Sequence, residues 1–211
     1  MPKIVNHEER REQIMAAIRR VIAHGQINDA TIRVIAREAG CSAGVLAHYF
    51  RDKDEMMTSA LRWSHKGIRA RQSEKLASLR GLAALRELLL DNLPLDEERT
   101  VETRLEVSYW SRALGSQQIL DVQRQEAALL YDKIRSLLKE ARDLGQIRRD
   151  VQLDDATEVF LALIDGLSVH ALLYPDRLTR EMAERLMLGE LERLVVGTSI
   201  EDIGPSDPVP R

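Results

Sequence analysis

Apolar residues recur at helical spacing along almost the whole of this chain, and this periodicity limits the folds that it can adopt. In the segment 8–23, five apolar residues follow the i, i+3, i+4, i+7, i+8 pattern of one buried helical stripe: Ile14, Ala17, Ile18, Val21 and Ile22. Leu, Ala, Arg and Glu dominate the composition, whereas the apolar–polar alternation of β-strands is missing. The sequence therefore predicts an all-α protein.

Glycine, proline and capping residues divide this sequence into about nine predicted helices. After 8–23, short helices are predicted at 32–39 and 43–50, because Thr31 and Ser42 precede them and are favoured N-cap residues. Gly40 lies in the turn between the two and allows the backbone to reach positive φ. Longer helices are predicted at 53–71 or beyond, 82–92, 97–114, 117–144, 154–173 and 179–196.

The two short predicted helices have the pattern of a helix-turn-helix. Ala36 provides a small residue where the helices cross, and Gly40 lies in the tight turn. We expect an inner face formed by Ile32, Ile35, Ala39, Leu46 and Phe50 to pack on the first helix. The segment 42–49 is then presented outward.

The residue types on that outward face suit a major groove. A recognition helix enters the groove N-terminus first, so small and apolar residues would approach base edges and thymine methyl groups. His48 and Tyr49 follow one turn later, and Lys53 and the amides around it can bind phosphate. The predicted DNA-binding residues are Thr31, Arg33, Ser42, Ala43, Gly44, Val45, His48, Tyr49 and Lys53.

The charge distribution favours the same partner. Residues 1–80 contain 15 Lys and Arg against 9 Asp and Glu, whereas residues 81–211 contain 16 against 25. A basic N-terminal part is suited to a polyanion, and an acidic remainder is not. Double-stranded DNA is the predicted partner of the first part.

The window 31–53 closely resembles the TetR family of bacterial transcriptional regulators. The residues that carry the resemblance are Thr31, Ile35, Ala36, Ala39, Gly40, Ser42, Gly44, Phe50 and Lys53. Ala47 stands where many members have a tyrosine, so one contact with the DNA backbone is in doubt. Within the family, the segments 44–53, 109–110 and 162–167 are similar to choline-responsive repressors of glycine betaine synthesis.

This resemblance implies the domain organisation. A DNA-binding domain is expected at 8–54, within a family-type domain of about 8–68. A ligand-binding and dimerisation domain is expected at 55–197. The proline-rich composition of 198–211 separately predicts a flexible tail.

The apolar segments near the C-terminus favour a homodimer. The segment 154–173 is apolar nearly all round, so it should be buried on more than one side. The segment 179–196 offers a matching stripe, and two helices from each chain would close a four-helix interface. The alternative is a monomer that keeps both helices in its own core.

Aromatic residues make up only 4% of the chain, so their positions guide the search for an effector site. A quaternary ammonium ligand needs aromatic faces and a carboxylate. Glu102, Glu106 and Tyr109 share one helical face, and Asp165 is expected to be a buried carboxylate. The predicted ligand-binding residues are Trp63, Glu102, Glu106, Tyr109, Trp110, Tyr131, Phe160 and Asp165. A choline-like cation is one candidate, and other small organic effectors stay open.

Other classes of protein are not supported. The chain contains none of the glycine-rich phosphate loops, nucleophile elbows or zinc-ligand motifs of common enzyme families, so no enzyme and no cofactor are expected. Its single cysteine, Cys41, excludes an internal disulfide. The apolar run 159–164 is too short to span a bilayer, and 1–9 has no signal-peptide pattern, so we expect a cytoplasmic protein without membrane contact.

Two alternatives to a ligand-released homodimeric repressor remain at this stage. The first is an efflux-type TetR regulator with a wide apolar pocket for lipophilic cations. The second is a helical protein-interaction module that has lost DNA binding.

Overall fold

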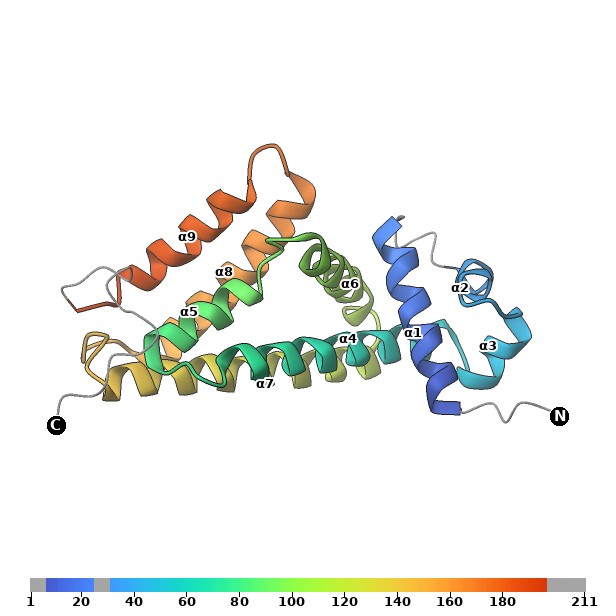
Figure 1. Cartoon of the computed structure of the whole chain (residues 1–211), viewed down its shortest axis with the longest axis horizontal. Coiled ribbons are helices and arrows are strands. Elements are labelled where there is room, and N and C mark those ends of the chain that lie inside the picture. The colour runs from blue at the N-terminus through green and yellow to red at the C-terminus, as the bar shows by residue number, and fades with distance from the viewer. Residues whose placement is uncertain (1–6, 25–30, 197–211) are drawn as a thin grey trace. The chain divides into compact units, whose positions relative to one another are not determined.

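The chain is a helical protein, as the sequence predicts. The computed structural model describes residues 7–24 and 31–196, and within these ranges it has nine helices and no strand beyond an isolated bridge between Ile147 and Val195 (Figure 1). The predicted flexible tail at 198–211 lies outside the described residues. The helices are α1 (His7–His24), α2 (Ile32–Glu38), α3 (Ala43–Tyr49), α4 (Lys53–Leu76), α5 (Gly81–Asp91), α6 (Glu97–Ala113), α7 (Gln117–Asp143), α8 (Leu153–Leu173) and α9 (Arg180–Glu192).

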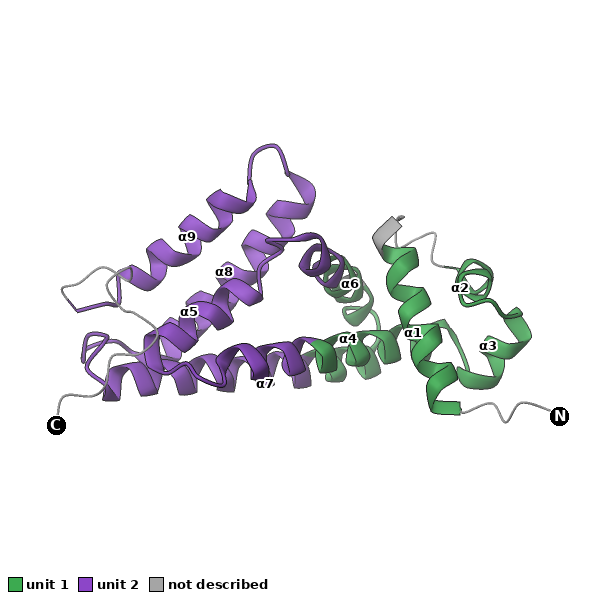
Figure 2. Ribbon diagram, in the orientation of Figure 1, with its two compact units in different colours: residues 1–67, 104–123 green, residues 68–103, 124–211 purple. Residues whose placement is uncertain are grey.

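The helices form two compact units (Figure 2). The first consists of residues 1–67 and 104–123, and the second of residues 68–103 and 124–211. The predicted helix-turn-helix therefore lies wholly in the first unit. That unit also contains 55–67 and 104–123, which the sequence analysis grouped with the ligand-binding domain.

The core of the first unit is built on the predicted stripe of α1, where Ile14, Ile18 and Ile22 are buried. The expected inner face of the helix-turn-helix is confirmed at Ile35, Leu46 and Phe50, which are also buried. The expectation for Ile32 is wrong, because this side chain is 39% exposed. Helix α2 has only two turns, and its buried residues Ile35 and Ala36 leave the first position at the edge of the packed face.

The core of the second unit is built around α5, whose five leucines are all buried. Helix α9 packs on both α5 and α8, and buried residues of α7 complete the cluster. Helix α9 ends at Glu192, four residues before the predicted end. The backbone beyond it pairs with the segment after α7 instead, since Arg148 N–H donates to Leu194 O at 2.9 Å.

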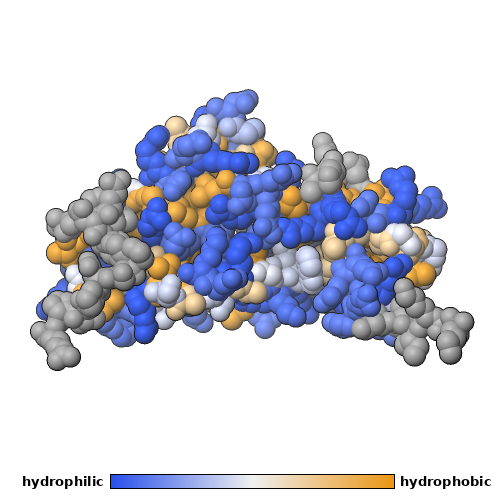
Figure 3. Space-filling model, in the orientation of Figure 1, coloured by the Kyte–Doolittle hydropathy of each residue, from blue (hydrophilic) through white to orange (hydrophobic). Residues whose placement is uncertain are grey.

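Helix α8 is long and strongly apolar. By length and composition alone it could cross a membrane, a test that core helices of soluble proteins also pass. Only 28% of its apolar window is buried within the chain. Hydrophobic surface is visible in Figure 3 over the region of α5, α8 and α9. The exposed large apolar residues there include Val159, Leu173 and Leu186.

Candidate DNA-binding and effector sites

The helix-turn-helix begins with two side-chain caps that the sequence predicted. Thr31 Oγ1 accepts a hydrogen bond from Val34 N–H at 3.3 Å, and Ser42 Oγ accepts one from Val45 N–H at 3.3 Å. Both caps have extended backbone, as N-cap residues require. Gly40 has φ 62°, a left-handed conformation that disfavours any side chain. The angle between α2 and α3 is thus set by local chemistry.

Helix α3 presents the predicted reading face to solvent. Its inner residues Leu46 and Phe50 are buried, which fixes the opposite face outward. The exposed residues on and beside that face are Thr31, Arg33, Ser42, Ala43, Gly44, Val45 and His48, whereas Tyr49 is half-buried. Small exposed residues at the N-terminal end of a short helix allow close approach to base edges.

Lys53 lies at the first position of α4, where the backbone amides are held by neighbouring carboxylates. Glu55 N–H donates to Asp52 Oδ1 at 2.8 Å, and Arg51 N–H donates to a Glu55 carboxylate oxygen at 2.9 Å. The bond from Glu55 N–H, and then the Arg51 guanidinium, lower the pKa of Asp52. The two hydrogen bonds around Asp52 and Glu55 fix the position of the Lys53 backbone.

Three polar contacts join α6 to α4 within the first unit; we call them the α4–α6 seam. The hydroxyl of the buried Tyr109 donates to Thr58 Oγ1 at 2.6 Å, and Thr58 donates to Asp54 O at 2.7 Å. Arg112 contacts the Asp54 carboxylate. His65 and Glu106 form the third contact, at 2.8 Å. Asp54, the residue after Lys53, therefore contacts α6 directly.

Glu106 is the centre of a largely buried polar cluster, the Glu106 cluster, formed with His65, Trp110 and Gln123. Its carboxylate accepts hydrogen bonds from Trp110 Nε1 at 3.2 Å and Gln123 Nε2 at 2.6 Å, besides the contact with His65. Burial alone would raise the pKa of Glu106, but these three partners, led by His65, lower it. The carboxylate is therefore held in its charged form.

Gln123 carries an unusual feature in this cluster. Its Oε1 atom is buried and has no hydrogen-bond partner, because its Nε2 is turned toward Glu106. The sequence analysis missed both His65 and Gln123. They lie 41 and 17 residues from Glu106, and no periodic pattern reports contacts at such separations.

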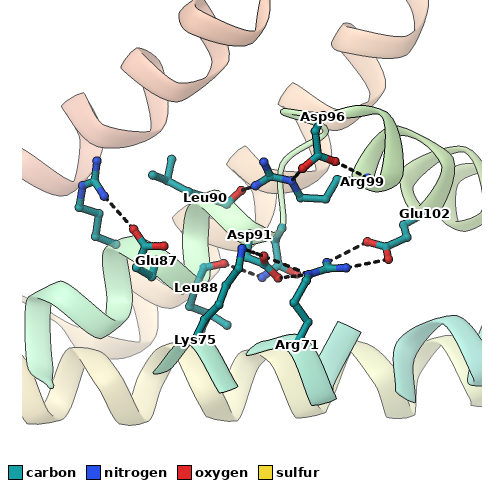
Figure 4. Close-up of polar contacts among 11 residues, drawn as sticks. Arg71, Lys75, Glu87, Leu88, Leu90, Asp91, Asp96, Arg99 and Glu102 are labelled. Carbon is teal, nitrogen blue, oxygen red and sulfur yellow. Dashed lines mark hydrogen bonds and ion pairs between the residues drawn. The ribbon is translucent and has the colours of Figure 1, made fainter. Parts of the chain in front are cut away.

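Glu102 does not join this cluster, because it belongs to an ion network of the second unit (Figure 4). Arg71 binds both carboxylate oxygens of Glu102, at 2.9 Å each, and also reaches Asp91 at 3.2 Å. Lys75 adds a bond of 2.7 Å to the same Asp91. The charge of Glu102 is thus already matched within the protein.

The remaining predicted ligand-binding residues are dispersed. Phe160 is buried in the core of the second unit, and Tyr131 donates to Asp154 at 3.2 Å. The expectation that Asp165 is buried is wrong, because it lies on the face of α8 that the second unit leaves exposed. Trp63 is half-buried, and it precedes His65 by two residues, so the two side chains leave α4 in different directions.

Comparison with known families decides the class of protein. Residues 14–60 match the family described as bacterial regulatory proteins, tetR family, and residues 81–196 match the BetI-type transcriptional repressor C-terminal family. The chain belongs to the TetR family. It is a helix-turn-helix transcriptional repressor with a BetI-type C-terminal part, and it is not an enzyme.

Relatives of this TetR-family regulator match over most of their length. The HTH-type transcriptional regulator PksA of Bacillus subtilis is 28% identical, with 93% of this chain and 95% of the relative covered. The regulator BetI of Escherichia coli O45:K1 is also 28% identical, with 88% and 94% covered.

Solved structures share the fold. A transcriptional regulator of Rhodococcus has a TM-score of 0.77 at 27% identity, covering 87% of this chain and 95% of that chain. A transcriptional regulator of Saccharomonospora viridis, solved in complex with choline, has a TM-score of 0.85 at 23% identity. The match covers 91% of this chain and 100% of the Saccharomonospora viridis chain.

Proposed function

We propose that this regulator binds an inverted-repeat operator as a homodimer and leaves it when a small cation occupies the first unit. The observation that carries the DNA-binding part is the outward face of α3, fixed by two side-chain caps and a left-handed glycine. Each α3 would enter one major groove, with the two helices about 34–36 Å apart or a near multiple. Thr31, Arg33, Tyr49 and Lys53 would contact the flanking backbone, and Val45 would read bases. His48, one turn later, would reach a base or a phosphate.

The homodimer is supported by the uncovered apolar surface of α8 and α9. Val159 and Leu173 on α8 and Leu186 on α9 are each roughly half or more exposed in the single chain. An apolar patch of this kind on a helical pair is typical of a subunit interface. A second copy of the chain is the partner that a two-fold operator requires.

The Glu106 cluster is the effector site that we propose. Glu106 offers a charged carboxylate, and the Trp110 ring is adjacent to it, which together suit a quaternary ammonium group. Gln123 Oε1 is a buried acceptor that a hydroxyl group on the same ligand would satisfy. A cation with a hydroxyl, such as choline, has both features, and the Saccharomonospora viridis neighbour was solved with choline.

The α4–α6 seam provides a route from this site to DNA. A ligand that draws Glu106 away from His65 loosens the contact of α6 with α4. Asp54, beside the predicted phosphate ligand Lys53, is held by the same α6. A typical coupling free energy of about 1–3 kcal/mol would weaken operator binding roughly 5–150-fold.

Selection of DNA from a random pool at about 0.15 M salt tests the first part of the proposal. We expect an inverted repeat to be enriched, and choline but not betaine to release the selected duplex. Release by many lipophilic cations would favour the efflux-type alternative. A pool that stays random would overturn the repressor mechanism and favour a protein partner.

A matched pair of variants tests the effector site. Glu106→Gln removes the charge but keeps the size of the side chain, so choline should no longer release an operator that still binds. Glu97→Gln changes an exposed glutamate at the start of the same helix and should respond as the unmodified protein does. An unchanged choline response in Glu106→Gln would place the effector elsewhere.

The dimer is tested in the same way at α9. Leu186→Lys puts a charge into the proposed interface and should yield a monomer in sedimentation analysis. Leu114→Lys, at an 88% exposed position of the first unit, is the control and should stay a dimer. A Leu186→Lys protein that remains dimeric would exclude this face.

A further inference from the structure

His7, the first residue of α1, lies in an aromatic cluster that the predicted DNA-binding residues did not include. Its ring centroid is 6.2 Å from that of His48 and 5.6 Å from that of Tyr49. His48 and Tyr49 are themselves 5.8 Å apart and meet edge to face, at 88°. Both histidines are exposed, and Tyr49 is half-buried.

The cluster lies at the C-terminal end of α3, which in the proposed complex faces the DNA backbone. A recognition helix points its N-terminus at the bases, so its last turn meets the phosphates at the rim of the groove. His48 and Tyr49 belong to that turn. Since His7 contacts both rings, it brings the start of α1 to the same rim.

Charged groups of both signs lie near the cluster. On α1, the nearest charges in sequence are Glu8 and Glu9 beside His7, and Arg10 and Arg11 one turn later. The Arg11 guanidinium lies 5.2 Å from the centre of the ring of Phe50, the residue that follows Tyr49.

After α3, the nearest carboxylate is already engaged. Asp52 binds the Arg51 guanidinium at 3.0 Å and Glu55 N–H at 2.8 Å, and Lys53 follows.

We propose that His7 is a further DNA-backbone residue, and that His7 and His48 together bind an operator phosphate and take up protons when they do so. The inference rests on the proposed operator binding and deepens it. Two positive imidazoles at 6.2 Å repel each other, and a phosphate beside both compensates for that repulsion. An imidazole side chain can gain a positive charge near neutral pH. Operator affinity therefore increases as the pH is lowered.

The test is operator affinity measured by fluorescence anisotropy from pH 6 to pH 8 at constant ionic strength, with the duplex that selection provides. We expect the affinity of the unmodified protein to fall roughly tenfold or more over this range, as release of bound protons requires. His7→Phe keeps a ring against His48 and Tyr49 but cannot be protonated, so its affinity should fall only about threefold. At pH 6 its salt slope should also be smaller by about one for each subunit bound, and at pH 8 unchanged.

Two further variants make the result unambiguous. His7→Gln, which keeps a hydrogen-bond donor at an exposed position, should lose the same pH dependence as His7→Phe. Lys66→Gln removes an exposed positive charge of α4 that is not an imidazole, and it should keep the full dependence. Equal pH dependence in His7→Phe and the unmodified protein would overturn the role of His7 while operator binding stands. Absence of sequence-selective binding at every pH would instead overturn the proposed function.

Discussion

Lys53 shows how one residue can be tested apart from the reading face. It begins α4 directly after the segment 51–52, and we expect its ammonium group to bind a phosphate. Lys53→Ala should weaken binding to every duplex by a similar factor, because phosphate contacts carry no sequence information. It should reduce the salt slope by about one for each subunit bound. Lys66→Ala, on the same helix, should leave the slope unaltered. An unchanged slope in Lys53→Ala would show that it is not a phosphate ligand.

Arg71 joins two carboxylates in the second unit, and we expect it to contribute strongly to the stability of the fold. Its side chain is 22% exposed, and it binds Asp91, whose side chain is 2% exposed, together with Glu102 (Figure 4). Arg71→Met leaves a buried carboxylate with Lys75 alone, so the free energy of unfolding should fall by about 2–4 kcal/mol. Urea denaturation measures this change.

Arg80→Met is the control for Arg71→Met. The Arg80 side chain is 82% exposed and pairs with Glu140, and such surface pairs contribute under about 1 kcal/mol. If both variants lost the same free energy of unfolding, the buried position of Asp91 would not make the Arg71 contacts more stabilising than a surface ion pair.

At the scale of elements, the helix boundaries followed from local chemistry. The caps at Thr31 and Ser42 and the left-handed Gly40 act within a few residues, so the sequence displays them directly. The end of α9 was misplaced because it depends on a partner segment after α7 that is distant in sequence. Ile32 was misplaced because apolar spacing does not show where a packed face ends.

The same limit explains the partial prediction of the effector residues. The spacing placed Glu102, Glu106 and Tyr109 on one helical face, but it is Glu106 and Trp110 that meet in the cluster. Their partners His65 and Gln123 come from α4 and α7, and Arg71 captures Glu102 from the second half of α4. Which helix covers which face is decided by tertiary packing that one sequence does not display.

The hydroxyl contact of the α4–α6 seam can be measured as a coupling between two helices. Tyr109→Phe and Thr58→Val, alone and together, form a double-mutant cycle read out by urea denaturation. Because the Tyr109 hydroxyl donates to Thr58 in a buried environment, we expect a coupling of about 0.5–1.5 kcal/mol. Tyr131→Phe, whose hydroxyl meets an exposed Asp154, should cost less than Tyr109→Phe. A coupling of zero would remove this bond from the seam.

At the scale of the whole molecule, the buried carboxylates predict how stability depends on acid. Burial alone would raise the pKa of Asp91, but hydrogen bonds from Lys75 and Arg71 lower it below its ordinary 3.8, and the pKa of Glu106 also lies below its ordinary 4.5. The folded chain therefore binds fewer protons than the unfolded chain in acid. The free energy of unfolding should be nearly constant above about pH 5 and should fall as the pH drops through these values.

Urea denaturation at a series of pH values checks this dependence. Asp91→Asn removes one titrating group and should flatten the acid limb, whereas Asp155→Asn, at an exposed position, should not. A flat profile in the unmodified protein down to about pH 3 would contradict the assigned directions.

The hydrogen bond from the Trp110 indole to Glu106 also makes the proposed effector site optically visible. The chain has two tryptophans, and Trp63→Phe leaves Trp110 as the single source of indole emission. Indole emission responds to the charge and hydration around the ring, so a cation that engages Glu106 would shift it. Effector occupancy can then be followed in solution without DNA and without an attached dye.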